Sequence, residues 1–125
     1  MAAGLLMALA GCASGGGRRP VAASLPQGVR LSEICGEGDP IPRLRVLGMD
    51  THGAALDGAD VEIRQGPRVV TGGRADEDGS ALFAVEAREY TVVWQRRGFV
   101  SPGPFPVRAK RGCEVQVVVE AEPVG

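Results

Sequence analysis

Apolar and polar side chains alternate in short runs over most of the chain, from residue 43 to residue 120. In the run EVQVVVE, Val115, Val117 and Val119 fall on one face, and polar residues take most of the other. A period of two with many β-branched residues is the signal of a half-buried strand. The pattern predicts seven short strands, at residues 43–49, 60–64, 68–71, 81–86, 90–95, 107–109 and 114–120.

Turn-forming residues separate these runs. Asp57 and Gly58 precede the second run, and Asp78 and Gly79 precede the fourth. The sequence SPGP at residues 101–104 excludes a helix at that point. Because no window has a useful helical periodicity, we expect an all-β fold, a single seven-stranded β-sandwich.

The composition limits both the core and the class of partner. Hydrophobic residues make up 44% of the 125 residues and aromatic residues only 4%, so small aliphatic side chains must build most of the core. Trp94 and Tyr90 lie on one face of their strand with Val92, which predicts core positions and a Tyr90 hydroxyl that reaches the backbone. A net charge of −1 argues against a nucleic-acid-binding protein.

The N-terminus has the features of an export signal. Residues 1–10 form an apolar segment that is too short to span a membrane. The following string, from Leu9 through Ala10 and Gly11 to Cys12, resembles the lipobox of bacterial lipoproteins. The resemblance implies cleavage before Cys12 and lipidation of its thiol, although no Lys or Arg precedes the apolar segment. The alternative is a buried N-terminal helix with an ordinary core cysteine.

This interpretation divides the chain into three parts. Residues 1–11 are a signal peptide, residues 12–30 a lipidated cysteine with a flexible tether, and residues 31–125 a sandwich with its core at 43–120. Acyl chains hold a protein on a membrane without spanning it. The expected location is the cell envelope, and the absence of Asp after Cys12 favours the outer membrane if the organism is diderm.

Two further cysteines, Cys35 and Cys113, remain if Cys12 carries lipid. An even pair in an exported chain predicts a disulfide. The alternative is two independent thiols. A metal site is disfavoured, because the two cysteines are far apart and the chain has one histidine.

The segment from residue 45 to residue 99 resembles the carboxypeptidase regulatory-like domain, a transthyretin-like (prealbumin-like) sandwich module. The matching residues are Gly53, Leu56, Gly58, Ala59, Val61, Ile63, Asp76, Gly79, Phe83, Val85, Tyr90, Val92 and Gly98. These positions are mainly structural, so the resemblance implies a fold and no particular activity.

Candidate catalytic and metal-binding groups are few. His52 is the only histidine, no G-x-S-x-G elbow is present, and the plain interpretation of His52 is a solvated loop residue. The acidic run from Asp76 to Asp78 lacks the spacing of an EF-hand, so a turn is favoured over a calcium site. Intradiol dioxygenases hold iron with two Tyr and two His, and this chain has one of each. We expect no enzyme activity, no metal and no cofactor.

The leading hypothesis is a membrane-anchored lipoprotein whose non-enzymatic sandwich binds an envelope protein or glycan, or supports an envelope assembly. Phe99 and Phe105, in the Pro-rich segment 98–106, are the candidate partner contacts, with a core position as the alternative for both rings. The second hypothesis is an accessory subunit of an envelope peptidase or of another carbohydrate- or protein-processing enzyme. We expect membrane lipid to be a partner through Cys12, and we expect no nucleic-acid partner.

Overall fold

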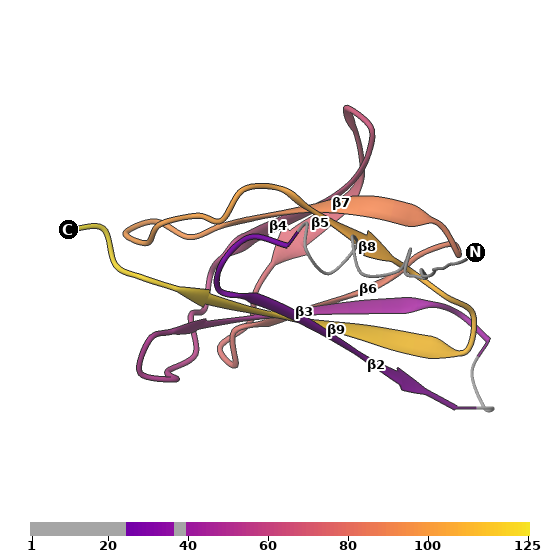
Figure 1. Ribbon diagram of the computed structural model, residues 1–125, viewed down its shortest axis with the longest axis horizontal. Helices are drawn as coiled ribbons and strands as arrows, with labels where there is room; N and C mark the ends of the chain where they lie inside the picture. The colour runs from indigo at the N-terminus through magenta and orange to yellow at the C-terminus, as the bar shows by residue number, and fades with distance from the viewer. Residues whose placement is uncertain (1–24, 37–39) are drawn as a thin grey trace, which may run out of the picture.

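The chain folds into two packed four-stranded β-sheets (Figure 1). The computed structural model describes residues 25–36 and 40–125, and these residues contain strands and turns with no helix. Consequently no helix in this part of the chain is long and apolar enough to cross a membrane. The strands are β2 (Val29–Cys35), β3 (Arg43–Asp50), β4 (Asp60–Gln65), β5 (Arg68–Arg74), β6 (Ser80–Ala84), β7 (Glu89–Gln95), β8 (Phe105–Arg108) and β9 (Cys113–Ala121).

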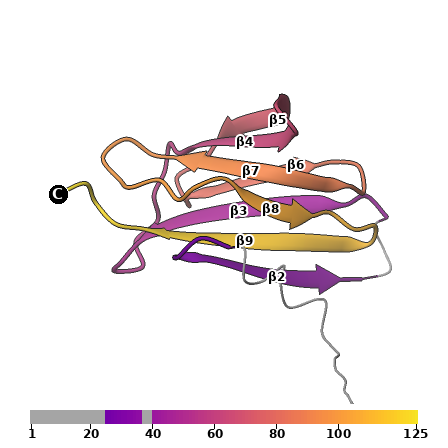
Figure 2. The same cartoon turned by 45° about the horizontal axis from the view of Figure 1, so that its top comes forward.

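The two sheets have the strand orders β2-β9-β3-β6 and β5-β4-β7-β8. β9 pairs in an antiparallel manner with β2 and in parallel with β3, so the last strand lies between two early ones. All other pairs are antiparallel. Figure 2 shows β5 and β2 at opposite margins of the sandwich. This arrangement leaves β2, β6, β5 and β8 as the four edge strands.

The core lies between the sheets and follows the alternation in the sequence. Val115, Val117 and Val119 are at most 2% exposed, as the pattern in β9 predicts. Trp94 and Tyr90 are buried on the inner face of β7, which confirms their expected core positions. The largest fully buried side chains are Trp94, Phe105, Leu44, Ile63, Val46, Val61, Val92, Val117 and Val119.

The all-β sandwich is confirmed, but it has eight strands in the described residues rather than seven. The additional strand, β2, begins at Val29 and therefore includes two residues that we assigned to the tether. Its alternation of inward apolar and outward polar residues is weak. Val29 and Leu31 point inward, but Glu33 takes the next position on that face, and the apolar Ile34 is 59% exposed on the other. Edge strands are often short and carry charged side chains, so a weak alternation is compatible with this position at the margin of the sheet.

Candidate functional site

The N-terminal predictions concern residues that the structure does not describe. The expected signal peptide at residues 1–11, the expected lipidation of Cys12 and the expected tether as far as residue 24 lie outside the described residues. The structure therefore describes only the folded domain that follows them.

Cys35 and Cys113 form a disulfide, as the cysteine count predicts. The two residues lie directly opposite each other in the β2–β9 ladder, and their Cα atoms are 4.0 Å apart. The bond joins the end of β2 to the start of β9 across a sequence separation of 78 residues. It therefore fastens the first described strand of the sheet to the last.

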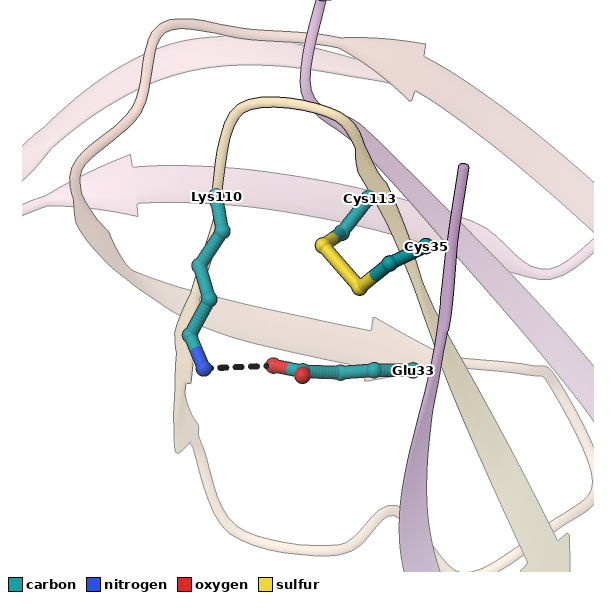
Figure 3. Close-up of a disulfide and its surroundings, with 4 residues drawn as sticks. All are labelled: Glu33, Cys35, Lys110 and Cys113. Atoms are coloured by element: carbon teal, nitrogen blue, oxygen red, sulfur yellow. Dashed lines mark ion pairs between the residues drawn. A yellow bond between two sulfur atoms is a disulfide. The ribbon is translucent and has the colours of Figure 1, made fainter. Parts of the chain in front are cut away.

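An ion pair lies next to the disulfide (Figure 3). The Lys110 Nζ is 3.0 Å from the Glu33 Oε2, and Lys110 belongs to the turn between β8 and β9. Both side chains are partly exposed, so this contact alone contributes at most about 1 kcal/mol. The disulfide connects β2 with the start of β9, and the ion pair connects β2 with the turn that precedes β9.

The two phenylalanines of the Pro-rich segment do not form an exposed contact surface. Phe105 is 0% exposed at the start of β8, so its assignment as a partner contact was wrong, and the alternative of a core position holds. Phe99 is half-buried and packs against the core, with the Arg96 guanidinium 5.7 Å from its ring centroid. The burial follows from the chain direction, because β8 returns antiparallel beside β7 and places Phe105 opposite Val92.

His52 lies in the exposed turn after β3, and the side chain of Asp50, two residues earlier, stabilises that turn. The Asp50 Oδ1 accepts hydrogen bonds from the backbone N–H groups of His52, at 2.8 Å, and Ala54, at 2.9 Å. These bonds, the one from Ala54 first, lower the pKa of Asp50 below its ordinary value. The carboxylate is therefore engaged in holding the loop rather than in activating His52.

The acidic run before β6 is a turn of the same kind. The Asp76 Oδ1 accepts backbone hydrogen bonds from Asp78 and Ser80, and Gly79 has a φ of 77°, as the turn prediction requires. Within residues 25–36 and 40–125, no group of three or more His, Cys, Asp or Glu side chains could hold a metal ion.

Tyr90 stabilises the corner before β7. Its hydroxyl donates a hydrogen bond of 2.9 Å to the Glu86 carbonyl oxygen, four residues earlier, as the sequence led us to expect. This geometry is that of a tyrosine corner, which is a recurrent device of β-sandwiches. Burial, and then the nearby Glu86 carboxylate, raise the pKa of Tyr90 and keep the hydroxyl a donor.

A groove opens on the margin of the sandwich formed by β5 and β6. It has a volume of about 550 Å³, and Tyr90 is buried beside it. The groove lies between one sheet and the other because β5 and β6 are edge strands that do not pair with each other. Its other lining residues are Ile41, Gln65, Arg68, Val70, Thr71, Ala84, Val85, Glu86 and Arg88.

Sequence reasoning missed this groove. The prediction of a strand at 68–71 was correct, but the strand extends to Arg74 and nearly all of it is exposed. The available signal was its sequence, RVVTGGR, which has an arginine at each end, two glycines and no acidic residue. The groove combines apolar and charged side chains beside an exposed strand, and we therefore take it as the candidate interaction site.

Comparisons with known proteins give no family assignment. No family model matches the chain, and no curated protein matches it. Among solved structures, part of the Bacillus anthracis TIE protein is similar, with 25% identity and a TM-score of 0.59. That match covers 66% of this chain and 17% of the other, so the chain corresponds to a small portion of a much longer protein.

A second solved structure is more distant. It is the 3-chlorocatechol 1,2-dioxygenase from Rhodococcus opacus 1CP, with 13% identity and a TM-score of 0.48. The match covers 72% of this chain and 63% of that one. This similarity is too weak to carry an argument about activity.

Proposed function

We propose that this protein is a lipid-anchored module of the bacterial cell envelope, whose β-sandwich binds a partner and performs no catalysis. The sandwich would be of the transthyretin-like type found in carboxypeptidase regulatory-like domains. Cys12 would carry the lipid, and the residues between it and β2 would serve as the tether.

The Cys35–Cys113 disulfide is the observation that carries this proposal. Disulfides persist in exported proteins and are rare in the reducing cytosol. Pairing of these two residues leaves Cys12 as the third of three cysteines, directly after the short apolar segment. Export, a single remaining thiol and the lipobox-like string therefore support the same location.

The folded domain supports a binding role. The polar groups of its turns are engaged in backbone hydrogen bonds, as at Asp50 and Asp76. The similarity to one portion of a long Bacillus anthracis protein agrees with a sandwich that serves as one module among others. The edge strands and the groove between β5 and β6 offer exposed backbone and side chains to a partner.

The test is the intact mass of the full chain purified from membranes of its own host, before and after reduction and alkylation. We expect a mature chain that begins at Cys12, carries added acyl mass and gains alkyl groups only after reduction. A Cys12→Ser variant is the control, and it should lose the acyl mass and leave the membrane fraction. An unprocessed chain with three free thiols would contradict the proposal.

A further inference from the structure

We infer that the free edge of β5, with the groove beside it, binds an extended acidic peptide of a protein partner by strand addition. This inference rests on the proposed binding function and specifies the class of partner. Strand addition combines main-chain hydrogen bonds along a sheet edge with pockets that take alternate side chains. The β5 margin supplies both features.

The backbone of β5 is open on one side. β5 pairs with β4 alone among the described strands, and six of its seven residues are exposed. In a strand at an edge, about every second residue directs its N–H and C=O away from the neighbour. The outer side of β5 therefore presents hydrogen-bonding groups that another extended chain can use.

The other edges are less suitable for an acidic strand. β8 has only four residues and includes Pro106, which has no N–H to donate. β2 carries Glu33 and ends at the disulfide. β6 has five residues, fewer than β5.

The groove provides room for apolar side chains next to the edge. Ile41 is 53% exposed and Val70 is 41% exposed on its walls. Val70 reaches this position through a β-bulge, because the ladder pairs Arg64 with Val69 and Ile63 with Thr71 and leaves Val70 without an opposite residue. A peptide on β5 would therefore place an apolar residue against Val70 and Ile41.

The charges on this margin favour an acidic partner. Arg68 and Arg74 begin and end β5, and the strand contains no acidic residue. The Arg74 Nε lies 3.3 Å from the Asp60 Oδ1. On the opposite wall of the groove, the Arg88 Nε lies 2.9 Å from the Glu86 Oε1. Arg68 makes no ion pair or side-chain hydrogen bond within the described part of the chain, so its charge is available to a ligand carboxylate.

The same charges disfavour pairing between two copies of this protein. Two antiparallel β5 strands centred on Thr71 would bring Arg68 of each copy opposite Arg74 of the other. Like charges directly opposite each other destabilise a strand pair. The occupant is therefore a different, acidic chain rather than a second copy.

The experiment measures the binding of fluorescein-labelled peptides to the full chain by fluorescence anisotropy. The probe alternates Val and Glu over about eight residues, near the length of an ordinary strand. A second peptide alternates Val and Lys, and a third is the Val/Glu peptide with alternate backbone nitrogens methylated. We expect only the first to bind, with an affinity that falls at high salt.

Two variants locate the site. Arg68→Glu should weaken binding of the Val/Glu peptide about tenfold or more, since it replaces an attraction with a repulsion. Arg97→Glu, in the exposed turn after β7, is the matched control and should bind like the wild type. Melting curves should be unchanged in both, because each side chain is exposed. In ¹⁵N-labelled protein, the peptide should shift the amide resonances of Arg68–Arg74.

Several results would overturn the inference. They are equal binding of the Val/Glu and Val/Lys peptides, unchanged binding by Arg68→Glu, full binding by the methylated peptide, or amide shifts centred on β2 or β8. The absence of binding up to about 1 mM peptide would overturn it as well. None of these results alters the mass of the mature chain, so they are distinguishable from a failure of the proposed anchoring.

Discussion

At Gly48 the sequence has a glycine because the facing sheet leaves no room for a side chain. An ideal Cβ at this position would lie 2.8 Å from the Cζ2 atom and 2.9 Å from the Nε1 atom of Trp94. The indole is 1% exposed and fills the space between β3 and β7. Its Nε1 has no hydrogen-bond partner among the described residues, so the ring is held by packing.

We predict that Gly48→Ala lowers the free energy of unfolding by about 1–3 kcal/mol, the usual cost of adding a methyl group to a filled core. Denaturant unfolding measures this change. Gly103→Ala is the control, because no atom lies within 4 Å of its ideal Cβ. Equal stability of the two variants would contradict this prediction, because the Trp94 ring would then have shifted to admit the methyl group without loss of stability.

We predict that Tyr90→Phe lowers the free energy of unfolding by about 1 kcal/mol at neutral pH, since it removes the hydrogen bond to the Glu86 carbonyl oxygen. The raised pKa of Tyr90 gives a second readout. The folded state binds this proton more tightly than the unfolded state, so stability should fall as the pH rises above the ordinary pKa of 10.0. Unfolding curves at neutral and alkaline pH should show a smaller decline in Tyr90→Phe.

At the scale of elements, the central strand β9 determines how the first sheet is assembled. Its inner face is a continuous row of small apolar side chains, whereas its outer face carries Glu114 and Gln116. The Glu114 Oε2 accepts hydrogen bonds of 2.9 Å from Gln116 and from Arg45 on the parallel strand β3. The bond from Gln116, and then that from Arg45, lower the pKa of Glu114.

This lowered pKa predicts a loss of stability in acid. The folded state favours the ionised Glu114, so its contribution is present at neutral pH and is lost as the pH falls from the ordinary value of 4.5 through the lower folded value. Because both partners are partly exposed, we expect Glu114→Gln to cost about 1 kcal/mol or less at neutral pH and almost nothing well below pH 4.5. Urea unfolding at both pH values tests this expectation. Glu122→Gln, at an exposed position after β9, is the control for the loss of one negative charge.

For the molecule as a whole, the first and last described strands are neighbours in one sheet, and the disulfide joins them covalently. The β2–β9 ladder joins segments that are far apart in the chain, so its formation is entropically costly. The covalent bond reduces that cost by restricting the unfolded chain. The edge strand β2 is thereby held covalently to β9, whereas the edge strands β5 and β6 have no covalent link to each other and do not pair.

We predict that the double variant Cys35→Ser with Cys113→Ser loses about 4 kcal/mol of stability, from the closure of a loop with a sequence separation of 78 residues. Thermal and denaturant unfolding measure the loss. Wild-type protein unfolded in the presence of a reductant is the comparison and should match the double variant. A variant as stable as the oxidised wild type would show that the β2–β9 ladder holds without the bond.

The sequence by itself determined the local structure of this protein. The alternation of Val with polar residues predicted β9 and β4, and the face shared by Tyr90 and Trp94 predicted their burial, because period-two patterning reports which side of a strand meets the core. The cysteine count predicted the disulfide through the chemistry of export.

Only the tertiary structure decided which strands are edges and what lies beside them. β2 was missed because its alternation is weak, and Phe105 was misplaced because its burial depends on the pairing of β8 with β7. The groove and the open backbone at β5 depend on two sheets ending side by side without pairing, an arrangement of distant segments that no local pattern records. Local periodicity identifies the buried face of each strand, whereas the pairing of strands far apart in the sequence determines the surface left for a partner.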